Sequence, residues 1–219
     1  MLYDTGMQLA IFDLDGTLVD SAPDLRAALN RLMAADGLPP FELPEVAAMI
    51  GDGARALLVK AYSARGLPLP GHALAPFLED LEANSAILTR SYPGMVETLE
   101  ALAARGWRCA ICTNKPIAAT TALLETLSLA QHFALVLGGD SLAVRKPDPG
   151  HVRGVLAALG VAASDAVMIG DHQNDIRAGS GAGVRTVFAA WGYGDGAGAD
   201  LIAASPSALP ALLNEADPG

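Results

Sequence analysis

Short apolar runs alternate with longer amphipathic stretches along most of this chain. We expect the apolar runs to be buried strands at residues 8–14, 107–112, 134–137, 166–169 and 186–189. The amphipathic stretches near the later strands have the length of helices, which we expect at 95–105, 117–127, 151–159 and about 175–182. Strands that alternate with helices in this way predict an α/β fold, with a parallel sheet wrapped by helices on both faces.

The segment between the first two predicted strands breaks this alternation. Residues 21–89 contain no convincing strand. Ser21-Ala22-Pro23-Asp24 has the pattern of a helix start with a capping box, and further helices are expected at 44–50, 54–65 and 73–88. A helical block of this length is not a simple crossover. We therefore predict a Rossmann-like core made of residues 1–20 and 90–219, with an inserted all-helical cap domain at 21–89.

Composition narrows the class of protein. The chain has 219 residues, of which 52% are hydrophobic, so it can bury a substantial core. Because it has neither a run as long as a membrane span nor a signal-peptide pattern, we expect a cytoplasmic protein with no membrane contact. Residues 1–6 fit no element, and Met7 is an alternative start.

A net charge of −10 argues against binding nucleic acid. An anionic substrate would need a local positive site.

Cys109 and Cys112 form a C-x-x-C sequence within a predicted strand. Residues three apart on a strand face opposite ways, so we expect buried thiols without a shared metal or disulfide. His72, His132 and His151 show no ligand spacing, and we interpret them as structural or surface residues.

Two carboxylates follow the first predicted strand directly. Asp13 and Asp15 are two positions apart and would point from one face of that strand, and Gly16 would let the backbone turn tightly beside a ligand. Two like charges this close repel unless a cation sits between them or one carboxyl is protonated, and either outcome is useful chemistry. The competing interpretation is an ordinary turn rich in Asp and Gly.

Polar residues also follow the other predicted strands. Ligands of open parallel sheets bind beyond the carboxyl ends of the strands, so we expect these residues to meet at one edge. They are Thr113-Asn114-Lys115 after the second strand, Lys146 after the third, and Asp171 and Asp175 after the fourth. Carboxylates suit Mg²⁺, and lysine and hydroxyl groups suit phosphate oxygens, so the set fits a magnesium and phosphate site.

These residues, in this order, resemble the haloacid dehalogenase superfamily of phosphotransferases over nearly the whole chain. The motifs of that family match Asp13 to Thr17, then Thr113, Lys146, and Gly170-Asp171 with Asp175. A narrower resemblance is to the phosphoglycolate phosphatases, carried by residues 13–25, 50–55, 112–116, 138–140 and 191–194. His172 and Gln173 lie where relatives vary, and Gly150 is unusual just inside a helix, but none of them is a motif residue.

The resemblance implies a role for each motif residue. Asp13 would be the nucleophile that forms an aspartyl-phosphate, and Asp15 the general acid and then base. Mg²⁺ would be held by Asp13, the Asp15 carbonyl and Asp171, with Asp175 as a direct ligand or just behind one. Thr113, Asn114, Lys146 and backbone amides near Gly16 would hold the phosphoryl oxygens. The expected substrate is a small phosphorylated metabolite, with 2-phosphoglycolate first.

The helical insert is the segment long enough to close over a substrate. Gly51-Asp52-Gly53 predicts a flexible turn before a helix, and Arg55 in its first turn is our candidate to bind a substrate carboxylate, unless it is a plain surface arginine. Structural roles also stay open for three residues of the core. Asp175 or Asn114 could cap a helix, and Lys115 could be solvated at the surface.

Two rival functions stay open on the sequence alone. A phosphohexomutase of the same fold would return the phosphoryl group to a sugar instead of to water. A receiver-type signalling domain also uses Asp, Mg²⁺, Thr and Lys on a parallel sheet, but it lacks the second acid at Asp15 and the large helical insert. The sequence leaves the oligomeric state open between a monomer and a homodimer.

Overall fold

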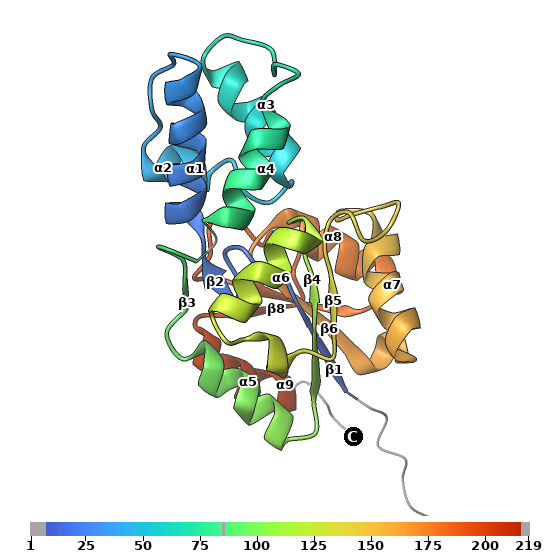
Figure 1. The fold of residues 1–219 in the computed structure, drawn as a ribbon. Helices are drawn as coiled ribbons and strands as arrows, with labels where there is room; N and C mark the ends of the chain where they lie inside the picture. The colour runs from blue at the N-terminus through green and yellow to red at the C-terminus, as the bar shows by residue number, and fades with distance from the viewer. Residues whose placement is uncertain (1–7, 85, 216–219) are drawn as a thin grey trace, which may run out of the picture.

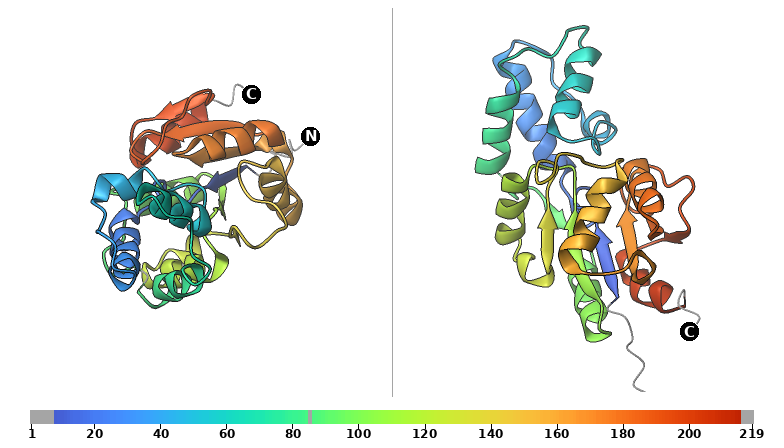
Figure 2. Two further views of the ribbon diagram at one scale, coloured as in Figure 1. Left: turned by 90° about the horizontal axis from the view of Figure 1, so that it is seen from above. Right: turned by 90° about the vertical axis from the view of Figure 1, so that its right-hand side faces the viewer.

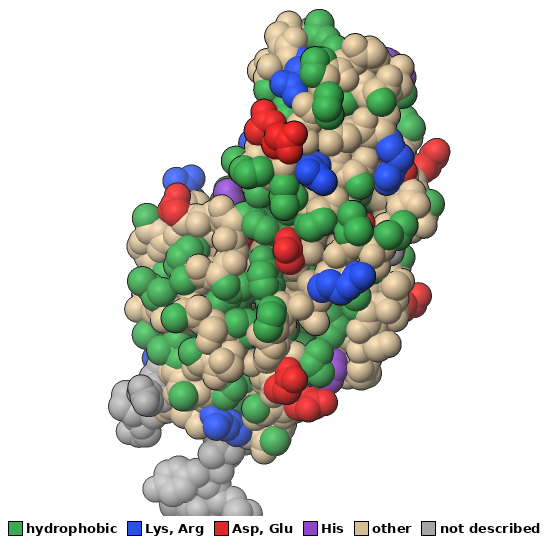
Figure 3. Space-filling model, turned by 90° about the vertical axis from the view of Figure 1, so that its left-hand side faces the viewer, with side chains coloured by type: hydrophobic (Ala, Val, Ile, Leu, Met, Phe, Trp, Pro, Cys, Tyr) green, Lys and Arg blue, Asp and Glu red, His purple; other side chains and the backbone are tan. Residues whose placement is uncertain are grey.

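The computed structural model describes residues 8–84 and 86–215, which form a large lobe and a small helical lobe (Figures 1 and 3). The large lobe is built on a six-stranded sheet in the order β5-β4-β1-β6-β7-β8, and each neighbouring pair is parallel. The strands are β1 (Leu9–Phe12), β4 (Arg108–Cys112), β5 (Leu135–Leu137), β6 (Ala166–Gly170), β7 (Arg185–Ala189) and β8 (Leu201–Ala203). The predicted α/β class with a parallel sheet is confirmed.

Helices cover both faces of this sheet (Figure 2). Ala10 and Phe12 of β1 pack in a core with α5 (Met95–Ala104), α6 (Ile117–Thr126) and α9 (Leu209–Glu215). Leu9 and Ile11 point the other way, into a core with α7 (Pro149–Leu159) and α8 (Gln173–Ala182). The period of two along a strand therefore fills two separate cores, as expected for a sheet buried on both sides.

The cysteines follow the same alternation. Cys109 belongs to the first of these cores and Cys112 to the second, and both are free, buried thiols, as predicted. Burial raises the thiol pKa of each to about 12, so neither is a ready thiolate.

The small lobe contains α1 (Ala22–Ala35), α2 (Leu43–Ala47), α3 (Ala54–Ala64) and α4 (Leu74–Ala83). We call residues 22–83 the helical insert. It has its own apolar core around Leu29, Leu58 and Phe77, and it stands beyond the carboxyl ends of the core strands (Figure 1). β2 (Val19–Asp20) and β3 (Arg90–Ser91) pair antiparallel where the chain enters and leaves it. The division into two domains at 20/21 and 89/90 stays a prediction.

The expected capping box at the start of α1 is absent. Ser21 occupies the N-cap position but makes no side-chain cap hydrogen bond. Its hydroxyl instead donates to Asp15, at 2.6 Å. The Asp24 carboxylate accepts from the backbone amides of Leu88 and Thr89, at 3.0 and 2.8 Å. Both side chains serve contacts outside α1, and Asp24 joins the start of the insert to the segment that follows it.

Several boundaries also differ from the sequence prediction. β1 ends at Phe12, so Asp13 and Asp15 lie in the loop after the strand and not on its face. α4 ends at Ala83 rather than at residue 88, because Leu88 and Thr89 bond to Asp24 instead of continuing the helix. β8 and α9 were not predicted. Within the described residues, no helix has both the length and the apolar character needed to cross a bilayer.

Candidate active site

Asp13 directly follows the last residue of β1, at the edge of the sheet where the parallel strands end. Its amide donates to the Ile169 carbonyl of β6 at 2.9 Å, which fixes the residue at the carboxyl edge of the sheet. The residue is 6% exposed. Its Oδ1 accepts from the Leu14 amide at 2.7 Å and lies 2.9 Å from Lys146 Nζ. Oδ2 is therefore the freer oxygen of this carboxylate.

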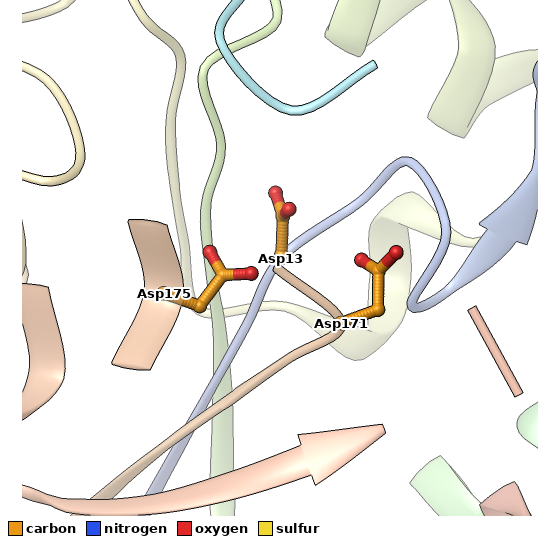
Figure 4. Close-up of side chains that lie close together, drawn as sticks. All are labelled: Asp13, Asp171 and Asp175. Carbon is orange, nitrogen blue, oxygen red and sulfur yellow. The ribbon is translucent and has the colours of Figure 1, made fainter. Parts of the chain in front are cut away.

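Asp171 and Asp175 complete a cluster of three carboxylates with Asp13 (Figure 4). One oxygen of each lies within 4.8 Å of the others, and all three residues are buried. Asp171 follows β6 and accepts from the Thr17 hydroxyl at 3.0 Å. Asp175, in the first turn of α8, accepts from Lys146 Nζ at 2.6 Å and from the His172 amide at 3.0 Å.

This cluster carries excess negative charge. Three carboxylates against the single Lys146 ammonium leave two negative charges. Burial, together with the charge of Asp13, raises the pKa of Asp171 to about 6. Burial also raises the pKa of Asp175, because it outweighs the opposing effect of Lys146. A divalent cation such as Mg²⁺ would balance these two negative charges, and it prefers oxygen ligands such as these buried carboxylates.

Asp15 lies apart from this cluster and faces the insert. Its carboxylate accepts from the Ser21 hydroxyl at 2.6 Å and from Lys115 Nζ at 3.2 Å. It lines the same cavity as Asp13. The structure therefore separates the two carboxylates, with Asp13 among the possible metal ligands and Asp15 in the cavity beside a hydroxyl and an ammonium group.

The cavity lies between the insert and the carboxyl edge of the sheet. The core contributes Asp13, Asp15, Thr113, Asn114, Lys115 and Pro116. Thr113 is held at the end of β4 by its amide, which donates to the Leu137 carbonyl at 3.0 Å. The insert contributes apolar side chains and glycines. The cavity is thus polar where the core carboxylates lie and apolar under the insert.

A model of haloacid dehalogenase-like hydrolases matches residues 7–183 of this sequence. The chain belongs to this family.

Individual members of this hydrolase family show how close the similarity is. A phosphoglycolate phosphatase of Rhodospirillum rubrum is 44% identical over 191 residues, covering 84% of this chain and 79% of that protein. A phosphoglycolate phosphatase of Caulobacter vibrioides is 41% identical over 210 residues, covering 92% of this chain and 88% of that protein. Together with the family match, they identify the chain as a phosphoric monoester hydrolase.

Two solved structures are similar to this chain in fold. A predicted phosphoglycolate phosphatase from Haemophilus somnus superposes with a TM-score of 0.88 at 30% identity, covering 96% of this chain and 99% of that one. CbbY from Rhodobacter sphaeroides, in complex with phosphate, gives a TM-score of 0.75 at 25% identity, covering 93% of this chain and 96% of that one.

Most of the site residues expected from the sequence of this hydrolase come together. Asp13, Asp171, Asp175 and Lys146 form one buried cluster, and Asp15, Thr113 and Asn114 line the adjoining cavity. The helix-capping interpretation also applies to Asp175, because its Oδ2 caps α8 while Oδ1 contacts Lys146. Asn114 does not cap α6, where the Ile117 amide donates to Asp140 instead. Lys115 is buried, so the solvated interpretation of this residue is wrong.

Gly16 and Arg55, the two other residues expected to bind substrate, do not present a group to the cavity. Gly16 has φ +84°, and a Cβ there would approach Asp171 Oδ2 to 2.2 Å, so only glycine fits this turn. Its amide donates to the Val19 carbonyl at 2.9 Å, within the turn itself. The Arg55 side chain is exposed and does not line the cavity. Roles for both in substrate binding stay predictions.

Sequence reasoning missed the residues that hold the carboxylates in place. Thr17 and the Tyr193 amide both donate to Asp171, the latter at 2.8 Å. The Tyr193 hydroxyl donates to Asp20 at 2.6 Å, at the entry to the insert. Ser21 donates to Asp15. Local spacing does not signal the contacts of Thr17 and Tyr193, because their partners lie 22 to 173 positions away in the sequence.

Two core amides hold the loop at Gly51, which connects α2 to α3. Asn114 Nδ2 and Asn174 Nδ2 both donate to the Gly51 carbonyl, at 2.9 and 3.2 Å. Asn174 also donates to Asp52 at 2.7 Å, and Asp52 in turn pairs with Lys60 of α3 at 2.6 Å. Because one amide comes from the loop after β4 and the other from the first turn of α8, they fix the insert against the site at one point.

We expect Asn174→Ala to loosen this contact. Loss of a hydrogen bond to a charged acceptor such as Asp52 typically costs enough to lower kcat/KM about 10-fold, if the insert must close for turnover. Amide hydrogen exchange should rise at residues 50–54. Gln173→Ala is the matched control, because that side chain bonds to Asp195 and Ala197 and not to the insert. Unchanged exchange and activity in Asn174→Ala would show that the contact is incidental.

Proposed function

We propose that this hydrolase is a Mg²⁺-dependent phosphatase that converts 2-phosphoglycolate to glycolate and phosphate through an aspartyl-phosphate on Asp13. The observation that carries the proposal is the buried cluster of Asp13, Asp171 and Asp175, in which Lys146 pairs with Asp13 and Asp175, at the end of a cavity that also contains Asp15. The similarity to two phosphoglycolate phosphatases supports 2-phosphoglycolate as the substrate. The cytoplasmic location and the choice between monomer and homodimer stay predictions.

Asp13 is suited to attack phosphorus. Lys146 and the Leu14 amide engage Oδ1, which leaves Oδ2 to form the new bond. As that bond forms, the bond from phosphorus to the ester oxygen breaks. Asp15, on the cavity side, would give its proton to the departing alkoxide and then take one from the water that hydrolyses the intermediate.

The remaining residues would position the phosphoryl group and a metal ion. Thr113 and Asn114 line the cavity next to Asp13, and Lys146 adds a buried positive charge. Mg²⁺, held by Asp13, Asp171 and the Asp15 carbonyl, would offset the repulsion between the carboxylates and the phosphate. We place Asp175 behind these ligands, where its ion pair with Lys146 and its hydrogen bond from the His172 amide would hold the cluster in position.

The direct test is a screen for phosphate release over small phosphomonoesters, with and without Mg²⁺. We expect 2-phosphoglycolate to give the highest kcat/KM and activity to disappear in excess chelator. The same reactions, followed for isomerised sugar phosphates, separate a phosphatase from a phosphohexomutase. Activity that resists chelation, or sugar isomerisation without phosphate release, would contradict the proposal.

Stability should depend on the metal and on pH together. Asp171 has a raised pKa of about 6, so the folded, metal-free protein holds a proton that the unfolded chain releases. The usual pKa of an aspartate is about 4. Between about pH 4 and about pH 6, the stability of the metal-free protein therefore falls as the pH rises. Because Mg²⁺ binds the ionised carboxylates, its stabilising effect should increase over the same interval.

Thermal denaturation at about pH 5 and about pH 7.5, with and without Mg²⁺, measures this effect. We expect the larger rise in Tm at the higher pH. Ca²⁺ should also raise Tm but support turnover poorly, because its longer and more numerous contacts would disturb in-line attack. Absence of a shift with either ion, or an equal shift at both pH values, would contradict a metal site built from these carboxylates.

A further inference from the structure

The cavity has an unusual distribution of charge. The insert side is formed by Leu25, Ile50, Ala54, Leu57 and Leu81, together with the backbone of Gly51 and Gly53. None of these groups can form an ion pair with an anion. Among the described residues that line the cavity, Lys115 is the only cationic one. Within the lining of this cavity, an anionic group on the substrate, apart from its phosphate, therefore has one cationic side chain with which to pair.

We infer that Lys115 is the residue that binds the carboxylate of the substrate, an inference that rests on the proposed function. Lys115 follows β4, and its amide donates to the Thr113 hydroxyl at 3.2 Å, which places it next to the expected phosphate site. Its side chain is 6% exposed, and Nζ lies 3.2 Å from Asp15 Oδ1. The ammonium group is thus fixed beside the proposed general acid.

The chemistry of phosphoglycolate matches this position. Asp15 must approach the ester oxygen to protonate it, and in phosphoglycolate only one methylene separates that oxygen from the carboxylate. An ammonium group beside Asp15 is therefore at the right range to contact the carboxylate at the same time. The other buried lysine, Lys146, lies between Asp13 and Asp175 and faces the nucleophile.

Lys115 also explains how an insert with an apolar wall could still select an anionic substrate. A short carboxylate gains little from Leu57 or Leu81, so selection by the insert alone would favour neutral esters. With Lys115 on the core side, the apolar wall excludes water and strengthens the ion pair that forms beneath it. Arg55, the sequence-based candidate for the same role, is exposed outside this cavity.

The test compares phosphoglycolate with its neutral amide, phosphoglycolamide, on the intact protein with Mg²⁺. The two esters match in size and differ in charge. For Lys115→Met we expect kcat/KM to fall about 10-fold or more on phosphoglycolate beyond any fall on the amide, because a charged hydrogen bond is lost. Lys115→Arg should recover part of the preference. Arg177→Met, which removes an exposed charge on α8, should keep the wild-type ratio.

Each outcome decides between distinct interpretations. Equal losses on the two esters would mean that Lys115 acts through Asp15, and the inference would be wrong. The inference would also be wrong if Lys115→Met lost activity on neither ester, and selective loss in Arg55→Met would then assign the role to Arg55. A wild-type enzyme that cleaves the amide as well as phosphoglycolate would overturn both the inference and the proposed substrate. Thermal denaturation of each variant checks that the fold is intact.

Discussion

Asp13→Asn should abolish turnover of every phosphomonoester, by about 10³-fold or more, while the fold remains intact. The amide is nearly isosteric with the carboxylate but a poor nucleophile. Its oxygen can still accept from the Leu14 amide, as Asp13 Oδ1 does at 2.7 Å. The measurement is phosphate release under saturating substrate, with circular dichroism to confirm folding.

Two controls make this result specific to Asp13. Mass spectrometry must exclude deamidation of the new Asn, which would restore the nucleophile. Asp195→Asn is the matched substitution at an exposed position and should retain wild-type activity. Substantial phosphate release by verified Asp13→Asn protein would show that another group attacks phosphorus.

The stretches that could be predicted from this sequence are those whose signal is local. The central strands β1, β4 and β6 carry a continuous apolar run, because they are buried on both faces, and the sequence places them to within a few residues. Asp13, Asp171 and Lys146 were predicted to meet because the carboxyl ends of parallel strands share one edge of the sheet.

The elements that were missed have weak or ambiguous local patterns. β8 has only three residues and lies at the edge of the sheet, where Ile202 is 67% exposed, so its apolar pattern is incomplete. The sequence around Ser21 predicts a capping box, but both side chains bind tertiary partners instead, Ser21 to Asp15 and Asp24 to Thr89. Local propensity was overridden there by contacts that only the folded chain creates.

The least predictable part of the site is where the insert meets the core. Arg55 was a reasonable candidate from its place in the first turn of α3, but the direction of a side chain depends on how that helix is rotated over the sheet. The fold turns Leu57 toward the cavity and leaves Arg55 exposed. Similarly, Asn174 contacts Gly51, which is 123 positions away in the chain. A single sequence carries no signal for such a contact.

Asp15→Asn should also fail in turnover, but in a way that distinguishes it from Asp13→Asn. Asp15 faces the cavity beside Lys115 and Ser21, where a leaving group would emerge. Loss of an acid–base group typically costs about 10²–10⁴-fold. Aryl phosphates have good leaving groups that need little protonation, so their attack by Asp13 should be partly spared. Hydrolysis of the aspartyl-phosphate needs a base, so that intermediate should persist.

Rapid-quench experiments with an aryl phosphate measure both effects together. In Asp15→Asn protein we expect a burst of phenol close to one equivalent per enzyme, and a phosphoryl group that stays on the protein. Asp13→Asn should give neither, which separates the nucleophile from the acid–base residue on one substrate. If alkyl and aryl esters lose activity equally and no phospho-enzyme accumulates, Asp15 does not transfer the proton. Its contacts with Ser21 and Lys115 would then be structural, and the acid would have to be sought elsewhere along the cavity.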